Sequence, residues 1–229
     1  MAAGEGRRLR PLTERWPKPV LPIDGRPVVA TLLRELALAE LRRIWLVTGH
    51  LAGQVEALVG DGSAFGLEIR TVRQPGVLGS ADAVQRGLAG GAEPPCLVLA
   101  ADTVFTPGDL GRFAQAFASS GAAGAMSGRR DPPPDPPHRW ALKVANGLVV
   151  QPLDDDPANP LSGAPLWALG PKLVPFLDGL GGPPFELGDA YANAIATGLP
   201  IAAVEIGKTR DLTYPLDLVK ENFPYLRTT

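Results

Sequence analysis

The sequence predicts an α/β protein with a Rossmann-like, mostly parallel sheet, helices on both faces of that sheet, and a small β-rich lobe. Up to about residue 130, short apolar runs alternate with segments whose apolar residues recur at helical spacing, as in successive β-α-β units. Beyond that point strands follow one another closely, and Asn146-Gly147 separates two of them. An Asn-Gly pair between two apolar runs is typical of a β-hairpin turn.

The first half of the chain supplies the main sheet. Strands buried on both faces are expected as continuous apolar runs, and helices as runs with apolar residues three and four apart. The predicted strands are residues 44–48, 67–72, 97–101 and 122–126. The predicted helices are residues 31–43, 54–59, 81–88 and 110–118.

The second half predicts a hairpin followed by separate strands and helices. The predicted strands are residues 140–144, 148–150, 164–169 and 201–206, and the predicted helices are residues 189–197 and 216–222. Residues 131–137 are rich in proline, which lacks the N–H that a strand ladder needs, so an exposed loop is expected there.

Composition excludes several classes of protein. The net charge of −2 over 229 residues gives no basic field for nucleic acid. No stretch reaches the roughly 18 apolar residues of a membrane span, and the N-terminus lacks the apolar core of a signal peptide. A single cysteine, Cys96, rules out a disulfide framework within the chain. We therefore expect a cytoplasmic protein without nucleic-acid or membrane partners.

The opening loop is the most informative segment. Gly4 and Gly6 lie in a loop followed at short range by Arg8 and Lys18, all residue types that can bind phosphate. A dinucleotide-binding loop would carry a third glycine where Leu9 stands and would run into a helix, and a Walker loop would end in G-K-[ST]. Both are absent. Without further information, the two cations are equally consistent with solvated surface charges.

This segment resembles the signature of the sugar-1-phosphate nucleotidyltransferases, A-A/G-G-x-G-T-R-L-x-P-L-T followed by P-K-P. The matching residues are Gly4, Gly6, Arg8, Leu9, Pro11, Leu12, Thr13, Pro17, Lys18 and Pro19. The resemblance implies one nucleotidyltransferase domain over residues 1–229, with a nucleotide-binding half (1–130) and a sugar-phosphate-binding half (131–229). Its partners would be an NTP and a sugar 1-phosphate, and a homo-oligomer stays open.

The resemblance implies roles for the loop and for the end of a strand. Ala3, Gly4 and Gly6 would bind the nucleotide, while Arg8 and Lys18 would stabilise phosphate charge during the reaction. Asp102 follows the predicted strand 97–101, at the carboxyl end where α/β sheets bind ligands. It would be a catalytic Mg²⁺ ligand, since Mg²⁺ prefers carboxylates and substrate phosphates. The alternative is an aspartate that caps the following turn.

A second matching stretch lies near residue 80, where the family has Q-x(4)-L-G-T-x-x-A. Gln74, Gly79 and Ser80 would bind the nucleotide base, the glutamine amide pairing with its edge. This match favours UTP or dTTP. Gln74 is otherwise a polar residue at the end of a strand.

The remaining assignments lie in the second half. Asp211 resembles the second metal ligand of the family's W-x-D-x-x-T-P-x-D-L motif, although the tryptophan is missing. Asp217 would then be structural, near a helix start. Asp154 and Gly163 fall where relatives bind the sugar, and Trp140 falls near a glycine that normally admits it. Residues 154–156 also fit a solvated acidic turn.

Two alternatives stay open for the function. One is a non-catalytic module that senses a nucleotide or a sugar phosphate, and the other is a CTP-dependent transferase for a non-sugar phosphate. Relatives also carry an apolar strand before the loop, where only Met1 stands here. The first β-strand of the sheet is therefore expected to be missing, and we expect the natural chain to begin further upstream.

Overall fold

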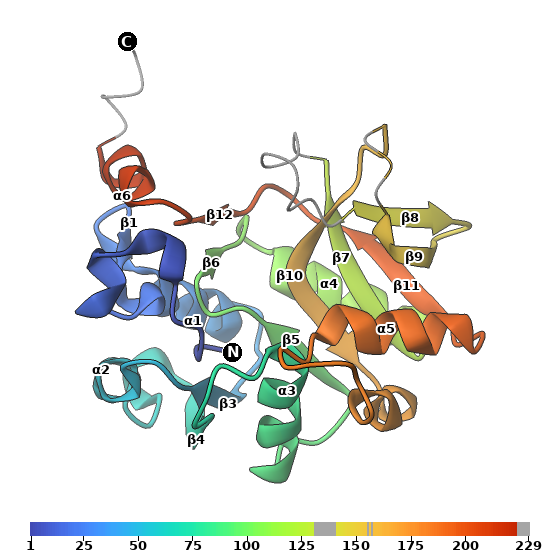
Figure 1. The fold of residues 1–229 in the computed structure, drawn as a ribbon, viewed down its shortest axis with the longest axis horizontal. Coiled ribbons are helices and arrows are strands. Elements are labelled where there is room, and N and C mark those ends of the chain that lie inside the picture. The colour runs from blue at the N-terminus through green and yellow to red at the C-terminus, as the bar shows by residue number, and fades with distance from the viewer. Residues whose placement is uncertain (131–140, 155, 157, 224–229) are drawn as a thin grey trace. The chain divides into compact units, whose positions relative to one another are not determined.

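The computed structural model describes residues 1–130, 141–154, 156 and 158–223. The chain divides into two compact units (Figure 1). Unit 1 comprises Met1–Val77, Ala100–Phe105 and Thr209–Thr229, and unit 2 comprises Leu78–Leu99 and Thr106–Lys208. Each unit thus combines distant parts of the sequence, whereas the expected halves were contiguous. The prediction of a single domain stays a prediction.

Unit 1 is built around a parallel pair of strands, β3 (Arg43–Thr48) and β4 (Glu68–Arg73). On the other side of β3, Ala2 forms a parallel bridge to Thr48, and the Ala2 N–H donates to the Val47 carbonyl at 2.7 Å. The Met1 carbonyl accepts from the Ala101 N–H at 2.8 Å. Met1 and Ala2 are therefore hydrogen-bonded both to β3 and to Ala101, at the place that the first strand occupies in relatives.

Short elements complete unit 1. Its helices are α1 (Val28–Leu38), α2 (Ala52–Val59) and α6 (Pro215–Asn222), with 3₁₀ helices η1 (Arg7–Leu9), η2 (Leu12–Glu14), η3 (Lys18–Val20) and η4 (Ser63–Phe65). Two short antiparallel pairs join β1 (Pro22–Ile23) to β2 (Arg26–Pro27), and β6 (Thr103–Val104) to β12 (Arg210–Asp211). A buried cluster of Leu9, Leu21, Ile23, Val28 and Leu212 holds these pieces together.

Unit 2 is a six-stranded mixed sheet in the order β5-β10-β7-β11-β9-β8. The strands are β5 (Cys96–Leu99), β7 (Gly124–Arg129), β8 (Ala141–Ala145), β9 (Leu148–Asp154), β10 (Ser162–Leu169) and β11 (Ile201–Glu205). Its helices are α3 (Ser80–Ala89), α4 (Asp109–Ser120) and α5 (Leu187–Ala196), with the 3₁₀ helix η5 (Pro171–Leu177). Figure 1 shows α4 and α5 on opposite faces of this sheet.

Apolar packing fixes the helices of unit 2 to its sheet. The ring of Tyr191 on α5 is almost fully buried, and its hydroxyl donates to the Ala168 carbonyl of β10 at 2.7 Å. Leu166, Ala168 and Leu169 present no exposed surface from β10. A strand paired on both sides and covered by helices reads as a continuous apolar run, which is why the sequence pattern located it.

The α/β class is confirmed, but the prediction of a mostly parallel sheet is wrong for unit 2. Only one pair of neighbouring strands in its sheet, β7 and β11, is parallel, and β10 runs antiparallel to both β5 and β7. The chain enters β10 after the β8–β9 hairpin without a crossover helix, and a parallel strand requires such a crossover.

The hairpin at Asn146-Gly147 is confirmed, because both residues have positive φ, 51° and 76°, between β8 and β9. The predicted loop 131–137 and Trp140 lie outside the described residues.

Candidate functional site

The opening loop starts at the edge of β3 and turns at Gly6. The Ala3 carbonyl accepts the N–H of His50 at 3.3 Å, which fixes the start of the loop beside the β3–α2 turn. Gly6 has a φ of 60°, and a Cβ there would lie 2.9 Å from Thr13 Cγ2. A residue other than glycine would therefore be strained and crowded at this position.

Thr13 and Leu9 close the loop from within unit 1. The hydroxyl of Thr13 donates to the Gly6 carbonyl at 2.9 Å, and Thr13 is 1% exposed. Leu9, also 1% exposed, anchors the middle of the loop in the cluster that contains Leu212. The signature residues Leu9 and Thr13 therefore shape the loop. At Gly4, by contrast, nothing lies within 4 Å of the place that a Cβ would occupy.

Lys18 meets two carboxylates at the end of this loop. Its Nζ lies 2.7 Å from Asp102 Oδ2 and 3.3 Å from Asp211 Oδ2. The β6–β12 pair brings the aspartates together, since Asp211 is in register with Thr103, next to Asp102. Three residues predicted from separate parts of the sequence thus form one cluster in unit 1, which we call the Lys18 cluster.

Electrostatics favour a cation in the Lys18 cluster. Burial alone would lower the pKa of Lys18, but the charges of Asp102 and Asp211 outweigh it and raise that pKa above its ordinary value. Two carboxylates separated by an ammonium group also form a suitable donor set for Mg²⁺. Among the described residues no group of three or more His, Cys, Asp or Glu residues could hold a metal. A Mg²⁺ ion here would need further oxygen ligands, which substrate phosphates and water supply.

The segment after Asp211 is held by a helix cap. The Asp217 carboxylate accepts the N–H groups of Thr213 at 3.0 Å and Tyr214 at 2.7 Å, at the start of α6. The Thr213 hydroxyl in turn donates to Asp211 Oδ2 at 3.2 Å. This agrees with the structural role expected for Asp217, and it orients the Asp211 carboxylate through Thr213.

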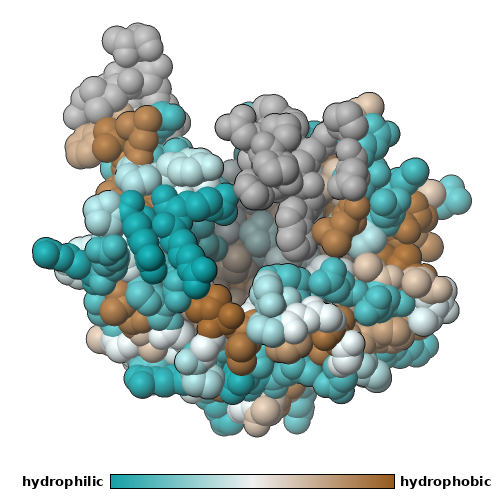
Figure 2. All heavy atoms as spheres, viewed as in Figure 1, coloured by the Kyte–Doolittle hydropathy of each residue, from teal (hydrophilic) through white to brown (hydrophobic). Residues whose placement is uncertain are grey.

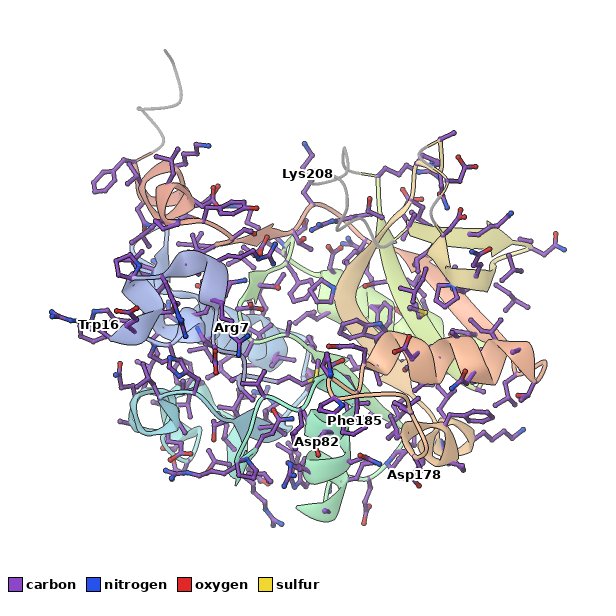
Figure 3. All side chains as sticks on the ribbon, viewed as in Figure 1. Arg7, Trp16, Asp82, Asp178, Phe185 and Lys208 are labelled. Carbon is purple, nitrogen blue, oxygen red and sulfur yellow. The ribbon has the colours of Figure 1, made fainter. Side chains whose placement is uncertain are left out.

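Several arginines surround the opening loop. Glu5 pairs with Arg7 at 2.6 Å and with Arg10 at 3.6 Å, and the hydrogen bond from Arg7 lowers the pKa of Glu5. Arg8 is exposed and has no ion pair within the described part of the chain. Figure 2 shows hydrophilic residues gathered over this loop, and Figure 3 labels Arg7 on it. Glu5 therefore neutralises part of the charge of Arg7 and Arg10, whereas Arg8 has no such partner among the described residues.

Gln74, the predicted base-reading residue of unit 1, lies directly after β4. Its N–H donates to the Thr48 carbonyl at 2.7 Å, and the residue is 5% exposed. This places it, like His50, beyond the carboxyl end of a parallel strand, the edge where ligands bind in α/β sheets.

Gly79 and Ser80 lie in unit 2, against the segment that leads into α5. A Cβ on Gly79 would collide with the backbone of Phe185, and the Phe185 N–H donates to the Leu78 carbonyl at 2.8 Å. The Ser80 hydroxyl donates to Glu186 Oε2 at 2.5 Å and accepts the Leu187 N–H at 2.7 Å. Figure 3 labels Phe185 beside α3. Both predicted nucleotide residues therefore have structural partners inside unit 2.

The two predicted sugar residues also lie in unit 2, around β9 and β10. Asp154 is 8% exposed and accepts from Asn159 Nδ2 at 2.8 Å and from the Asp156 N–H at 3.4 Å. Gly163 is in register with Gly128 of β7. Asp154 is a buried, hydrogen-bonded carboxylate, so a solvated acidic turn does not describe this residue.

The sequence reasoning missed three polar side chains that support these loops. His50 and Gln54 hydrogen-bond to carbonyls of the opening loop, and Glu186 pairs with Ser80. His50 follows the apolar strand β3 at its carboxyl end, the same signal that pointed to Asp102. Glu186 follows no such strand, and no local pattern marks it.

Comparison with known proteins gives the family. A family model described as "Nucleotidyl transferase" matches residues 1–137, more than half of the chain and the part that contains the opening loop and Asp102. The chain belongs to this family of nucleotidyltransferases.

Individual relatives match part of the chain. The N-acetylmuramate alpha-1-phosphate uridylyltransferase of Neisseria meningitidis serogroup B is 36% identical over 105 residues, 45% of this chain and 46% of that protein. The mannose-1-phosphate guanylyltransferase of Mycobacterium tuberculosis is 42% identical over 80 residues, 35% of this chain and 22% of that protein. The chain therefore spans less than half of the length of these curated relatives.

Solved structures match over almost the whole chain at low identity. A UDP-glucose pyrophosphorylase complexed with UDP-glucose has a TM-score of 0.79 at 18% identity, covering 100% of this chain and 97% of that one. A UDP-glucose pyrophosphorylase from Acinetobacter baumannii has a TM-score of 0.77 at 22% identity, covering 98% and 90%. These likenesses establish the fold.

None of the described helices has the length and hydropathy needed to cross a membrane.

Proposed function

We propose that the protein transfers a nucleotidyl group from an NTP to a sugar 1-phosphate, with release of pyrophosphate. The observation that carries this proposal is the Lys18 cluster, in which an ammonium group lies 2.7 Å and 3.3 Å from two carboxylates at the end of the glycine loop. Phosphoryl chemistry depends mainly on positioning and charge neutralisation, which such a cluster is suited to supply.

The reaction balances without a covalent enzyme intermediate. A phosphate oxygen of the sugar 1-phosphate attacks the α-phosphorus of the NTP and forms the new P–O bond. The bond from the α-phosphorus to the α–β bridging oxygen breaks, and pyrophosphate leaves with that electron pair. Lys18 and Arg8 would stabilise the developing negative charge, and the backbone at Gly4 and Gly6 would approach the phosphates.

We assign Mg²⁺ to Asp102 and Asp211. Bound Mg²⁺ supplies positive charge that neutralises triphosphate oxygens during the transfer. The carboxylate pair supports this assignment because it already holds the ammonium group of Lys18 between its oxygens. In the complex, Lys18 would move from the carboxylates toward the phosphates.

UTP or dTTP is the nucleotide that we favour. The support is Gln74, whose amide has both a donor and an acceptor and lies at the carboxyl end of β4. The named relatives are a uridylyltransferase and a guanylyltransferase, so the family alone leaves the base open. Gly79 and Ser80 for the nucleotide, and Asp154 and Gly163 for the sugar, are further assignments supported by sequence resemblance. The single cysteine and the metabolite substrates favour the cytoplasm as the site of action.

A panel that pairs NTPs with sugar 1-phosphates and with non-sugar phosphates, scored for pyrophosphate release with and without Mg²⁺, tests this function. We expect release with UTP or dTTP and at least one sugar 1-phosphate, and a loss of at least about a hundredfold in Lys18→Met and Asp102→Asn. Release only with CTP and a non-sugar phosphate would favour the alternative transferase. Nucleotide binding without release in any pairing would favour a sensing module.

A further inference from the structure

His50 contacts both ends of the opening loop. Its backbone N–H donates to the Ala3 carbonyl at 3.3 Å, where the loop begins. Its ring nitrogen Nε2 lies 2.6 Å from the Thr13 carbonyl, where the loop ends. A carbonyl only accepts hydrogen bonds, so this contact requires the proton on Nε2. One residue of the β3–α2 turn therefore fixes the separation of the two loop ends.

The contacts around His50 carry this constraint to the glycine turn. Thr13, whose carbonyl His50 holds, donates through its own hydroxyl to the Gly6 carbonyl at 2.9 Å. A Cβ on Gly49 would lie 2.7 Å from the Ala3 carbonyl oxygen, so the β3–α2 turn fits closely against the loop start. The chain of contacts runs from His50 through Thr13 to Gly6.

Gln54, the third residue of α2, adds a second side-chain hydrogen bond to the opening loop, and we call each of these two bonds a tie. Its Nε2 donates to the Arg15 carbonyl at 2.8 Å, two residues beyond Thr13. Two side chains of the same segment thus donate to carbonyls on the stretch that leads to Lys18. Both of these hydrogen bonds use carbonyl groups, so they occupy none of the N–H groups of the loop. The N–H groups of Leu9, Arg10 and Glu14 already donate to carbonyls within the loop.

We propose that His50 is a positioning residue for the phosphate-binding loop: it holds the loop in its ligand-ready shape through the Thr13 carbonyl. This inference rests on the proposed function for the identity of the ligand, a nucleoside triphosphate, but not for the tie itself. A preformed loop lowers the ordering cost of binding, so losing the tie should weaken nucleotide binding more than it affects global stability.

Two matched variants test the tie. His50→Gln keeps an N–H donor at about the reach of Nε2, whereas the amide of His50→Asn ends near the Nδ1 position and cannot reach Thr13. In hydrogen–deuterium exchange of the free protein, we expect peptides within residues 4–15 to exchange about fivefold faster in His50→Asn, the effect of one hydrogen bond. His50→Gln should stay within about twofold of the wild type.

Arg42→Leu is the control for a lost side-chain bond. It removes a hydrogen bond from Arg42 to the Gly66 carbonyl, 3.1 Å long and near the start of β3, and should leave loop exchange unchanged. Should His50→Asn fail to fold, His50→Ser removes the same donor. Equal exchange in the Asn and Gln variants, or in Asn and the wild type, would overturn the proposal.

Nucleotide kinetics separate this proposal from the proposed function. In an active wild type, His50→Asn should raise KM for the NTP about fivefold or more, with recovery in His50→Gln and a similar melting temperature in both. An active wild type with unchanged KM in His50→Asn would contradict the positioning role. An inactive wild type would instead contradict the proposed function, and the exchange result would still decide the tie.

Discussion

At the scale of the residue, Lys18 should affect both the stability of the fold and the proposed reaction. Its side chain is 15% exposed, and its ammonium group lies between carboxylates that are 28% and 41% exposed. Removing the ammonium group leaves two carboxylates facing each other with partial access to water. The resulting loss of unfolding free energy should therefore be smaller than the loss expected for breaking a fully buried ion pair.

We predict that Lys18→Met lowers the free energy of unfolding by about 1–2 kcal/mol at pH 7. The carboxylates raise the pKa of Lys18, so its contribution is complete below the unfolded-state pKa, near 10.5, and is lost as pH rises through the folded-state pKa. Urea unfolding of both proteins between pH 7 and pH 11 checks this. A difference in unfolding free energy that grows with pH would contradict it.

Cys96 provides a second prediction for a single residue. Burial raises the pKa of its thiol to about 11, so at pH 8 only about one molecule in a thousand carries the reactive thiolate. Native protein should react with a thiol reagent at least about a hundredfold more slowly than protein unfolded in urea. Equal rates in the two states would show that the thiol is accessible and unperturbed.

At the scale of the element, the first residue of α3 is hydrogen-bonded to the segment that begins α5, more than a hundred residues later. Ser80 is bonded to both the Glu186 carboxylate and the Leu187 N–H, at the first residue of α5. Ser80 is the first residue of α3, and its hydroxyl joins the starts of two helices. The sequence distance between these segments explains why no local pattern could predict the pairing.

Ser80→Ala should lower the free energy of unfolding by about 1–3 kcal/mol, because it leaves the Glu186 carboxylate and the Leu187 N–H without this partner. Ser80→Thr keeps the hydroxyl and should lose less than about half of that. The midpoint of urea unfolding measures both variants. Identical midpoints for Ser80→Ala and the wild type would mean that water replaces the hydroxyl without cost.

Also at this scale, α6 presents apolar side chains to solvent. Leu216 of α6 is 59% exposed, and Phe223, the residue after the helix, is 46% exposed. Figure 2 shows hydrophobic residues at this helix. Its inner side is held by Leu218 against the cluster that contains Leu212. The sequence predicted a helix over residues 216–222, but which face of the helix packs depends on that cluster.

At the scale of the whole molecule, local sequence patterns singled out three residues that the structure brings together. Asp102 was located because it ends an apolar strand, and Lys18 and Asp211 because their motifs are short and specific. The mixed sheet was missed because periodicity does not report strand direction. The roles of His50 and Glu186 were missed because both depend on contacts between segments far apart in the sequence.

The two compact units carry different parts of the proposed function. Unit 1 contains the opening loop, the Lys18 cluster and Gln74, so the groups assigned to phosphate and metal belong to one body. Unit 2 contains the residues assigned to the sugar, Asp154 and Gly163, and also two residues assigned to the nucleotide, Gly79 and Ser80. Variants in unit 1 therefore test the phosphate and metal chemistry, and the panel of substrates identifies the sugar.

Phosphorus NMR of one reaction tests the central claim most directly. The wild type, incubated with Mg²⁺, UTP or dTTP and the best sugar 1-phosphate of the panel, should produce pyrophosphate and a nucleoside-diphosphate sugar in equal amounts. Equal amounts follow from attack of the sugar phosphate on the α-phosphorus. Pyrophosphate with nucleoside monophosphate and unchanged sugar 1-phosphate, or no product while the nucleotide binds, would contradict the account.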